Sequence, residues 1–276
     1  MTADNFKWLV ITDLDGTFLN HHDYSFQNCL PALKQLASLD IPVIFNTSKT
    51  YRETLELQQQ LTIEAPFIVE NGSAVYFPVS QFAQKPIQKA TQRDRHWQVI
   101  TGETISAIHS KMTDTFLNMP GLIQLSKCTP QEARRLTGLT IAEAINAIAR
   151  EFSEPLMMED GNKFDEDFIH SIHQEGLTTL QGGRFLHVLG NCDKGKAIQV
   201  LTSCYQAVTR TIVLGDSAND AAMLMHADIP IVVKSPGNSP LLQQLSSPFI
   251  TTATAPEGWS EGINYALHTI SKEQTS

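Results

Sequence analysis

Short apolar runs that alternate with helical stretches constrain the fold of this chain most. Residues 8–12 and 41–46 are mainly apolar and have the length of buried strands, and we interpret residues 66–72, PFIVENG, as a third strand with its turn. Between them, residues 25–39 carry apolar side chains at helical spacing, and we predict a second helix over residues 51–61. This alternation of strand and helix predicts a parallel α/β sheet.

The pattern changes near residue 82. Capping boxes at residues 129–132 and 140–143 predict the starts of two helices, and we expect a third helix over residues 165–175. The segment LTTLQGGRFLHVLG, residues 177–190, predicts a β-hairpin that turns at its Gly-Gly pair. These elements indicate an inserted α+β unit.

After Gly190 the first pattern returns. We predict helices over residues 194–206 and 218–226, and strands over residues 211–216 and 229–233. The expected fold is therefore α/β, with a Rossmann-like core that contains a parallel sheet and an inserted α+β cap. The predicted core comprises residues 1–81 and 190–276, and the predicted cap comprises residues 82–189.

The composition opposes nucleic-acid and membrane partners. The chain has 276 residues and a formal net charge of -9, and an acidic protein is poorly suited to a phosphate backbone. No run approaches the ~18 apolar residues of a membrane helix, and the N-terminus lacks the features of a signal peptide. The four cysteines show no CxxC spacing and are typical of free thiols in a reducing compartment. We therefore expect a cytoplasmic protein.

Two predicted strands end in pairs of acids. In VITDLDGTFLN, Asp13 and Asp15 point to the same side of an extended segment and repel each other unless a cation or a shared proton lies between them. In TIVLGDSAND, Asp216 ends another apolar strand and Asp220 follows one helical turn later. A turn at Asp15-Gly16 alone would be ordinary. Four carboxylates at the carboxyl ends of strands instead predict a Mg²⁺ site.

Two further groups are placed to bind phosphate. Lys194 falls in the first turn of a predicted helix, where the helix dipole disfavours a cation, so a functional role is indicated. The alternative is a solvated surface lysine. Thr47, Ser48 and Lys49 follow the second strand, and their hydroxyl and N–H groups suit phosphate oxygens. Here the alternative is a loop that leads into a helix cap.

A second motif overlaps Lys194. GNCDKGK, residues 190–196, matches the GxxxxGK pattern of P-loop nucleotidases. The next residue is Ala197, whereas that motif requires a Ser or Thr whose hydroxyl holds Mg²⁺. A P-loop would also leave Asp13, Asp15 and Asp220 without a role.

The motifs carry a family resemblance. DLDGT, the Thr at the end of the second strand, the downstream Lys and GDSAND resemble the four motifs of the haloacid dehalogenase (HAD) superfamily of phosphotransferases, and the cap position resembles subclass IIB. The segments FNTSKT, PFIVENGSAVY, REFSEP, GGRFLHVLGNCDKGKA, GDSANDAAML and APEGW are similar to the mannosyl-3-phosphoglycerate phosphatase family. Ala218 departs from the proline that many relatives have there.

The resemblance implies roles for the core residues. Asp13 is then the nucleophile that forms a phospho-aspartate, and Asp15 is the general acid and base. Thr47 and Lys194 hold the phosphoryl group, and Ser48 and Lys49 contact the substrate. The implied Mg²⁺ ligands are Asp13, the Asp15 carbonyl, Asp216 and, through water, Asp220.

The resemblance also implies an activity, the Mg²⁺-dependent hydrolysis of mannosyl-3-phosphoglycerate to mannosylglycerate and phosphate. Arg150, Glu154 and Arg184 in the cap are candidates to bind the sugar or the glycerate carboxylate, and for each the alternative is a surface ion pair. A glucosyl-3-phosphoglycerate or sucrose phosphatase would share the core. A phosphomutase and a non-catalytic sugar-phosphate binding protein are more distant alternatives.

Overall fold

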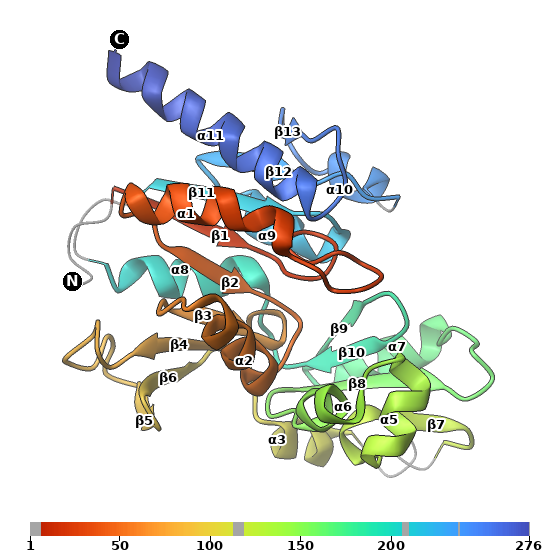
Figure 1. Ribbon diagram of the computed structural model, residues 1–276. Coiled ribbons are helices and arrows are strands. Elements are labelled where there is room, and N and C mark those ends of the chain that lie inside the picture. Colours follow the sequence, from red (N-terminus) through yellow and green to blue (C-terminus); the bar gives the residue numbers. More distant parts are fainter. Residues whose placement is uncertain (1–6, 113–118, 206–209, 237, 276) are drawn as a thin grey trace.

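The computed structural model describes residues 7–112, 119–205, 210–236 and 238–275. Within them, a nine-stranded sheet and a four-stranded sheet form the centres of two adjacent units (Figure 1). The strands of the large sheet follow one another in space as β13 (Phe249–Ile250), β12 (Ile229–Val232), β11 (Arg210–Gly215), β1 (Trp8–Thr12), β2 (Val43–Asn46), β3 (Phe67–Val69), β4 (Ala74–Pro78), β6 (His96–Ile100) and β5 (Thr91–Arg93).

The strands from β13 to β3 pair in parallel, which confirms the predicted parallel α/β sheet. Beyond β3, strands β4, β6 and β5 pair antiparallel and extend the same sheet. The prediction that the cap begins at residue 82 is therefore wrong, because residues 91–100 belong to the core sheet. β5 is the short polar segment TQR and β6 is the mixed segment HWQVI, so the pairing of β6 with β4 and of β5 with β6 leaves little trace in the sequence pattern.

Helices cover both faces of the large sheet. Trp8 and Val10 of β1 pack on the side of α1 (Leu30–Ser38), α2 (Tyr51–Leu61) and α11 (Glu257–Thr275). Leu9 and Ile11 pack on the opposite side with α8 (Lys194–Ser203), α9 (Ala221–Leu224) and α10 (Ser239–Leu242). Alternate residues point to opposite faces, so a strand buried on both faces reads as a continuous apolar run.

Short 3₁₀ helices occur in both units, three in the core and one, η3, in the cap, among the described residues. They are η1 (Gln27–Cys29), η2 (Glu70–Gly72), η3 (Leu125–Lys127) and η4 (Ala218–Asp220). The helix predicted over residues 194–206 ends at Ser203, and residue 206 lies outside the described residues. The helix predicted over residues 218–226 is shorter, because η4 and α9 together end at Leu224.

The second unit has an antiparallel sheet with helices against it, in the order β7-β8-β10-β9. The predicted hairpin and both predicted capping boxes are present. We propose that this cap runs from Thr104, the N-cap of its first helix, to Leu189. Its elements are α3 (Ile105–Lys111), β7 (Leu122–Gln124), α5 (Pro130–Thr137), α6 (Ile141–Ile148), β8 (Ser153–Met158), α7 (Glu166–Gln174), β9 (Thr178–Gln181) and β10 (Leu186–Leu189).

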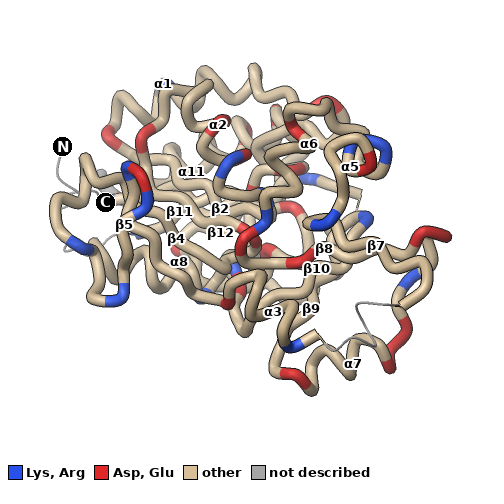
Figure 2. Tube along the Cα trace, turned by 90° about the horizontal axis from the view of Figure 1, so that it is seen from below, with Lys and Arg blue, Asp and Glu red and all other residues tan. Residues whose placement is uncertain are grey.

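Two general properties follow from the structure. All four cysteines are free. None of the helices in the described part of the chain has both the length and the apolar character of a membrane span. Charged residues of both signs lie where the cap meets the core, near α2, α6 and β8 (Figure 2).

Candidate active site

Two neighbouring parallel strands bring the first acids together. β1 and β11 end at the same edge of the sheet, so Asp13 and Asp216 lie side by side, and the Asp13 N–H donates to the Leu214 carbonyl at 3.0 Å. The Thr17 hydroxyl donates to Asp216 Oδ1 at 3.1 Å. Gly16 has φ +82°, and a Cβ there would lie 2.8 Å from Asp216 Oδ2. Glycine therefore lets the DLDGT turn fold directly against the second acid.

Lys194 lies between two of the acids. Its Nζ donates to Asp13 Oδ1 at 2.5 Å and to Asp220 Oδ1 at 2.7 Å, and the residue is 1% exposed. Burial lowers the pKa of Lys194, but the carboxylates of Asp13 and Asp220 raise it by more, so the ammonium group stays charged. Asp193 caps α8 as the sequence predicts. The alternative of a solvated surface lysine is excluded by this burial.

Asp220 holds the GDSAND segment, residues 215–220, in place. Its Oδ2 accepts the N–H groups of Asp216 at 2.9 Å and of Ser217 at 3.1 Å, while its Oδ1 accepts from Lys194. Both carboxylate oxygens are therefore engaged with the protein. This arrangement fixes the loop that carries Asp216 and orients the lysine; contact of Asp220 with a metal through water stays a prediction.

The acids suit a divalent cation that prefers oxygen ligands. Asp13, Asp216 and Asp220 each offer an oxygen, and the three oxygens lie within 4.8 Å of one another. Burial raises the pKa of Asp216 to about 7, with Asp220 adding to the effect. Burial also raises the pKa of Asp13 well above its usual range, although Lys194 opposes this shift. A cation among these carboxylates would favour their ionised forms, and an all-oxygen set fits Mg²⁺.

The loop after β2 lies beside these acids. Thr47 is buried, and its hydroxyl accepts the Lys49 N–H at 3.1 Å. Lys49 Nζ lies 2.9 Å from Asp15 Oδ1 and 4.8 Å above the centre of the Tyr24 ring. Burial lowers the pKa of Lys49, but the carboxylates of Asp15 and Glu53 raise it by more. Lys49 thus orients Asp15 in this conformation.

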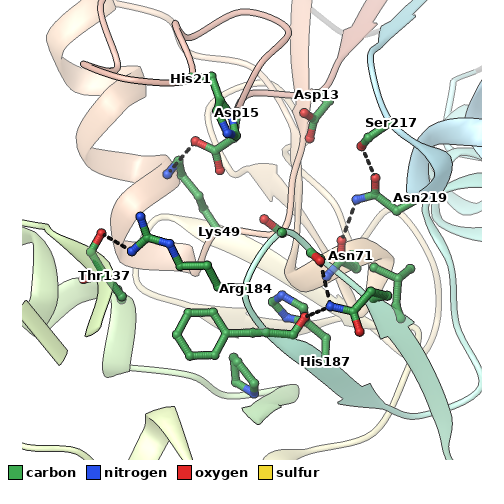
Figure 3. A pocket seen from close by; sticks show the side chains of 18 of the residues that line it. Asp13, Asp15, His21, Lys49, Asn71, Thr137, Arg184, His187, Ser217 and Asn219 are labelled. Atoms are coloured by element: carbon green, nitrogen blue, oxygen red, sulfur yellow. Dashed lines mark hydrogen bonds and ion pairs between the residues drawn. The ribbon is translucent and has the colours of Figure 1, made fainter. Parts of the chain in front are cut away.

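A cavity of about 560 Å³ separates this group from the cap (Figure 3). Asp13, Asp15, Ser48, Lys49 and Asp216 line its core side. From the cap, the turn and second strand of the β9–β10 hairpin face them. Several residues that the sequence motifs do not predict also line the cavity, namely His21, Tyr24, Asn71, Phe185, His187 and Asn219. Phe185 and His187 could have been predicted together, because residues two apart in the extended second arm of the predicted hairpin point to the same face.

Asn71 and Asn219 belong to a chain of polar contacts at the base of the cavity. The Ser217 hydroxyl donates to Asn219, and Asn219 Nδ2 donates to Asn71 Oδ1 at 3.4 Å (Figure 3). The Asn71 N–H in turn donates to the Thr47 carbonyl at 2.9 Å. These contacts connect the loops that follow β2, β3 and β11.

The three cap candidates have different surroundings. Arg184 lines the cavity, and its Nη1 donates to the carbonyls of Leu136 at 2.8 Å and Thr137 at 3.0 Å at the end of α5. Arg150 also lines the cavity, but its guanidinium donates to the Ser48 carbonyl at 3.0 Å and lies 3.3 Å from the Glu70 carboxylate. Arg150 therefore ties the cap to the core.

The structure corrects the prediction that Glu154 binds the substrate. Glu154 is 0% exposed and does not line the cavity. Its carboxylate accepts the Ser126 N–H at 3.0 Å and lies 2.6 Å from His109 Nε2. On β8 it pairs with Val188, which packs in the core of the cap, so its side chain points away from the cavity.

Comparison with known proteins decides the family. The sequence pattern of the haloacid dehalogenase-like hydrolases matches residues 10–255. The chain belongs to this family. It also matches a glucosyl-3-phosphoglycerate/mannosyl-3-phosphoglycerate phosphatase of Persephonella marina, at 36% identity over 96% of this chain and 98% of the relative. A protein of the same name from Methanococcoides burtonii is 35% identical over 93% of this chain and 96% of its own.

Solved structures agree on the fold. A Streptococcus mutans protein superposes on this HAD hydrolase with a TM-score of 0.68 at 18% identity and covers 96% of this chain and 100% of its own. The sucrose-phosphatase of Synechocystis gives a TM-score of 0.61 at 14% identity and covers 95% of this chain and 98% of its own. The predicted HAD fold is confirmed. Because the chain belongs to the HAD-like hydrolases and its relatives from Persephonella and Methanococcoides are named phosphatases, it is a phosphatase that cleaves phosphate monoesters. The P-loop alternative is excluded; Lys196 of that motif is exposed and bonds to Asn191.

Proposed function

We propose that this HAD phosphatase hydrolyses mannosyl-3-phosphoglycerate to mannosylglycerate and phosphate, with the glucosyl compound as the alternative substrate. The observation that carries the proposal is the cavity, which has Asp13 and Asp15 at its core end and Arg184 at its cap end. A substrate with a phosphate at one end and a carboxylate and a sugar at the other fits this distribution of charge. The names of the two relatives support the same substrates.

The proposed reaction proceeds in two steps. A carboxylate oxygen of Asp13 attacks phosphorus, the bond from phosphorus to the glycerate oxygen breaks, and Asp15 donates a proton to that oxygen. Water then attacks phosphorus of the phospho-aspartate while Asp15 accepts its proton, so that phosphate leaves and Asp13 is regenerated. Lys194 and the Thr47 loop would hold the phosphoryl oxygens. Asp13 and Asp216 would hold Mg²⁺, which offsets the negative charge of phosphate and carboxylates when bound.

A substrate panel with a free-phosphate readout tests the function. We expect the highest kcat/KM for mannosyl-3-phosphoglycerate or its glucosyl analogue, and much lower values for sucrose phosphate and p-nitrophenyl phosphate. Turnover without an added sugar bisphosphate would distinguish the enzyme from a phosphomutase. A preference for sucrose phosphate would overturn the proposal.

Asp15→Asn should lower kcat for mannosyl-3-phosphoglycerate by roughly 10²–10⁴-fold, because the variant has neither the acid nor the base. p-Nitrophenol leaves without protonation, so with p-nitrophenyl phosphate only the second step should be slowed. Rapid-quench kinetics on both substrates check this. If the variant released phosphate from p-nitrophenyl phosphate at the wild-type rate, Asp15 would not be the group that moves the proton.

Arg184→Ala should reduce kcat/KM for mannosyl-3-phosphoglycerate by about tenfold or more, since a hydrogen bond to a charged group contributes about 1.5–3 kcal/mol. The rate with p-nitrophenyl phosphate, which has no carboxylate, should change little. Arg135→Ala is the matched control, because Arg135 is an exposed cap arginine that does not line the cavity. Equal losses on both substrates would instead indicate a defect of the cap or the core.

A further inference from the structure

We propose that His187 binds the sugar ring and so determines the preference for a glycosylated phosphate ester; this inference rests on the proposed function. His187 lies on β10, is partly buried and lines the cavity from the cap side (Figure 3). Its Nδ1 is buried and has no hydrogen-bond partner among the described residues. A buried polar atom without a partner is costly, so a hydroxyl group of a ligand would satisfy it.

The neighbours of His187 form a surface that suits a sugar. Across the sheet, His187 pairs with Pro155 of β8 on one side and with Leu180 of β9 on the other. All three residues line the cavity, so one row of the cap sheet presents an imidazole between two apolar side chains. A hexose has C–H groups that pack on apolar surface and hydroxyls that need hydrogen bonds. An apolar wall with one placed polar group is the usual way to bind and orient such a ligand.

The hairpin leaves room for the imidazole. A Cβ at Gly182 would lie 3.1 Å from His187 Nε2, tighter than ordinary contact, so glycine at the turn makes space for the ring. Burial, together with the nearby charge of Arg150, lowers the pKa of His187 to about 3. The ring is therefore uncharged near neutral pH, with one nitrogen that donates and one that accepts. Such a ring suits a hydroxyl, whereas Arg184 suits the carboxylate.

The test compares two esters that differ only in the sugar, mannosyl-3-phosphoglycerate and 3-phosphoglycerate. The measured quantity is the ratio of their kcat/KM values. His187→Ala should reduce this ratio by at least about tenfold, the scale of one lost hydrogen bond in a buried site. Turnover of 3-phosphoglycerate should stay near wild type. His187→Gln retains a group that donates and accepts, and it should recover part of the ratio.

His170→Ala is the matched control, because His170 is an exposed cap histidine on α7, and it should keep the wild-type ratio. A structural role for His187 would lower the rates with both esters together and leave the ratio unchanged, which would overturn the inference. A ratio in His187→Ala equal to that of the wild type would also overturn it. A wild-type enzyme with no preference for the glycosylated ester would instead refute the proposed function itself.

Discussion

Asp13→Asn should reduce turnover of every phosphate ester by at least about 10⁴-fold, because an amide is a very poor nucleophile. The side chain keeps its volume, and Lys194 keeps its bond to Asp220, so the fold should be retained. Initial rates of phosphate release, with circular dichroism of the same samples, check this expectation.

A second aspartate provides the matched control for that variant. Asp167 is exposed on α7 of the cap, and Asp167→Asn makes the same change of charge away from the cavity. Its kcat should equal that of the wild type. If Asp13→Asn retained a substantial fraction of kcat while folded, the attacking group would have to be a different one.

Removal of divalent metal should abolish turnover, and Mg²⁺ should restore it. Burial raises the pKa values of Asp13 and Asp216, which shows that negative charge is unfavourable in this site. A further anion is therefore expected to bind there only together with a divalent cation. The single charge of Lys194 offsets only part of the charge of these carboxylates, so bringing a phosphate dianion next to them without a divalent cation is strongly unfavourable. Rates measured after treatment with EDTA, with the metal content confirmed, followed by titration with Mg²⁺, provide the measurement.

Thermal unfolding gives an independent readout of the same site. A ligand that binds only the folded protein adds about 2.7 kcal/mol to stability at a hundred times its Kd, so Mg²⁺ should raise the Tm of the wild type. Asp216→Asn removes one of the proposed carboxylate ligands and should largely suppress this shift. Full activity of metal-free protein, or an equal Tm shift in the variant, would contradict the assignment.

The sequence predicts the core of the site well because local rules determine it. β1 and β11 are short apolar runs that favour buried strands, and the strands of an open parallel sheet end at one edge, so the sequence predicts that Asp13 and Asp216 come together; the pairing of β1 with β11 places them side by side. Asp193 is an ordinary N-cap, which places Lys194 in the first turn of α8. The strand ends and the helix cap follow from local patterns, and only the order of the strands in the sheet has to come from the structure.

The cap was harder to predict because tertiary contacts decide it. Strand β6 joins the core sheet by pairing with β4, and β5 joins it by pairing with β6, although neither segment has the continuous apolar character of the central strands. Glu154 and Pro155 are adjacent in sequence, yet they point to opposite faces of β8, and only Pro155 lines the cavity. A list of charged cap residues cannot distinguish the two faces until the register with β10 is known.

The same limit applies to Arg150. Its charge suggests a ligand-binding residue, but the buried carboxylate of Glu70 lies 3.3 Å from its Nε. Glu70 also accepts the N–H groups of Glu151 at 2.9 Å and Phe152 at 3.1 Å. Such a partner, eighty residues away in sequence, becomes visible only when the chain is folded.

The central claim, that Asp13 carries the phosphoryl group during turnover, has a direct test. Asp15→Asn protein is mixed with p-nitrophenyl phosphate and Mg²⁺, quenched in acid during the first turnover, digested and mapped by mass spectrometry. We predict one phosphoryl group per chain on the peptide that contains Asp13, and none in the protein that also carries Asp13→Asn. Stoichiometric release of p-nitrophenol without phosphate on the protein, or phosphate on a different residue, would contradict the account.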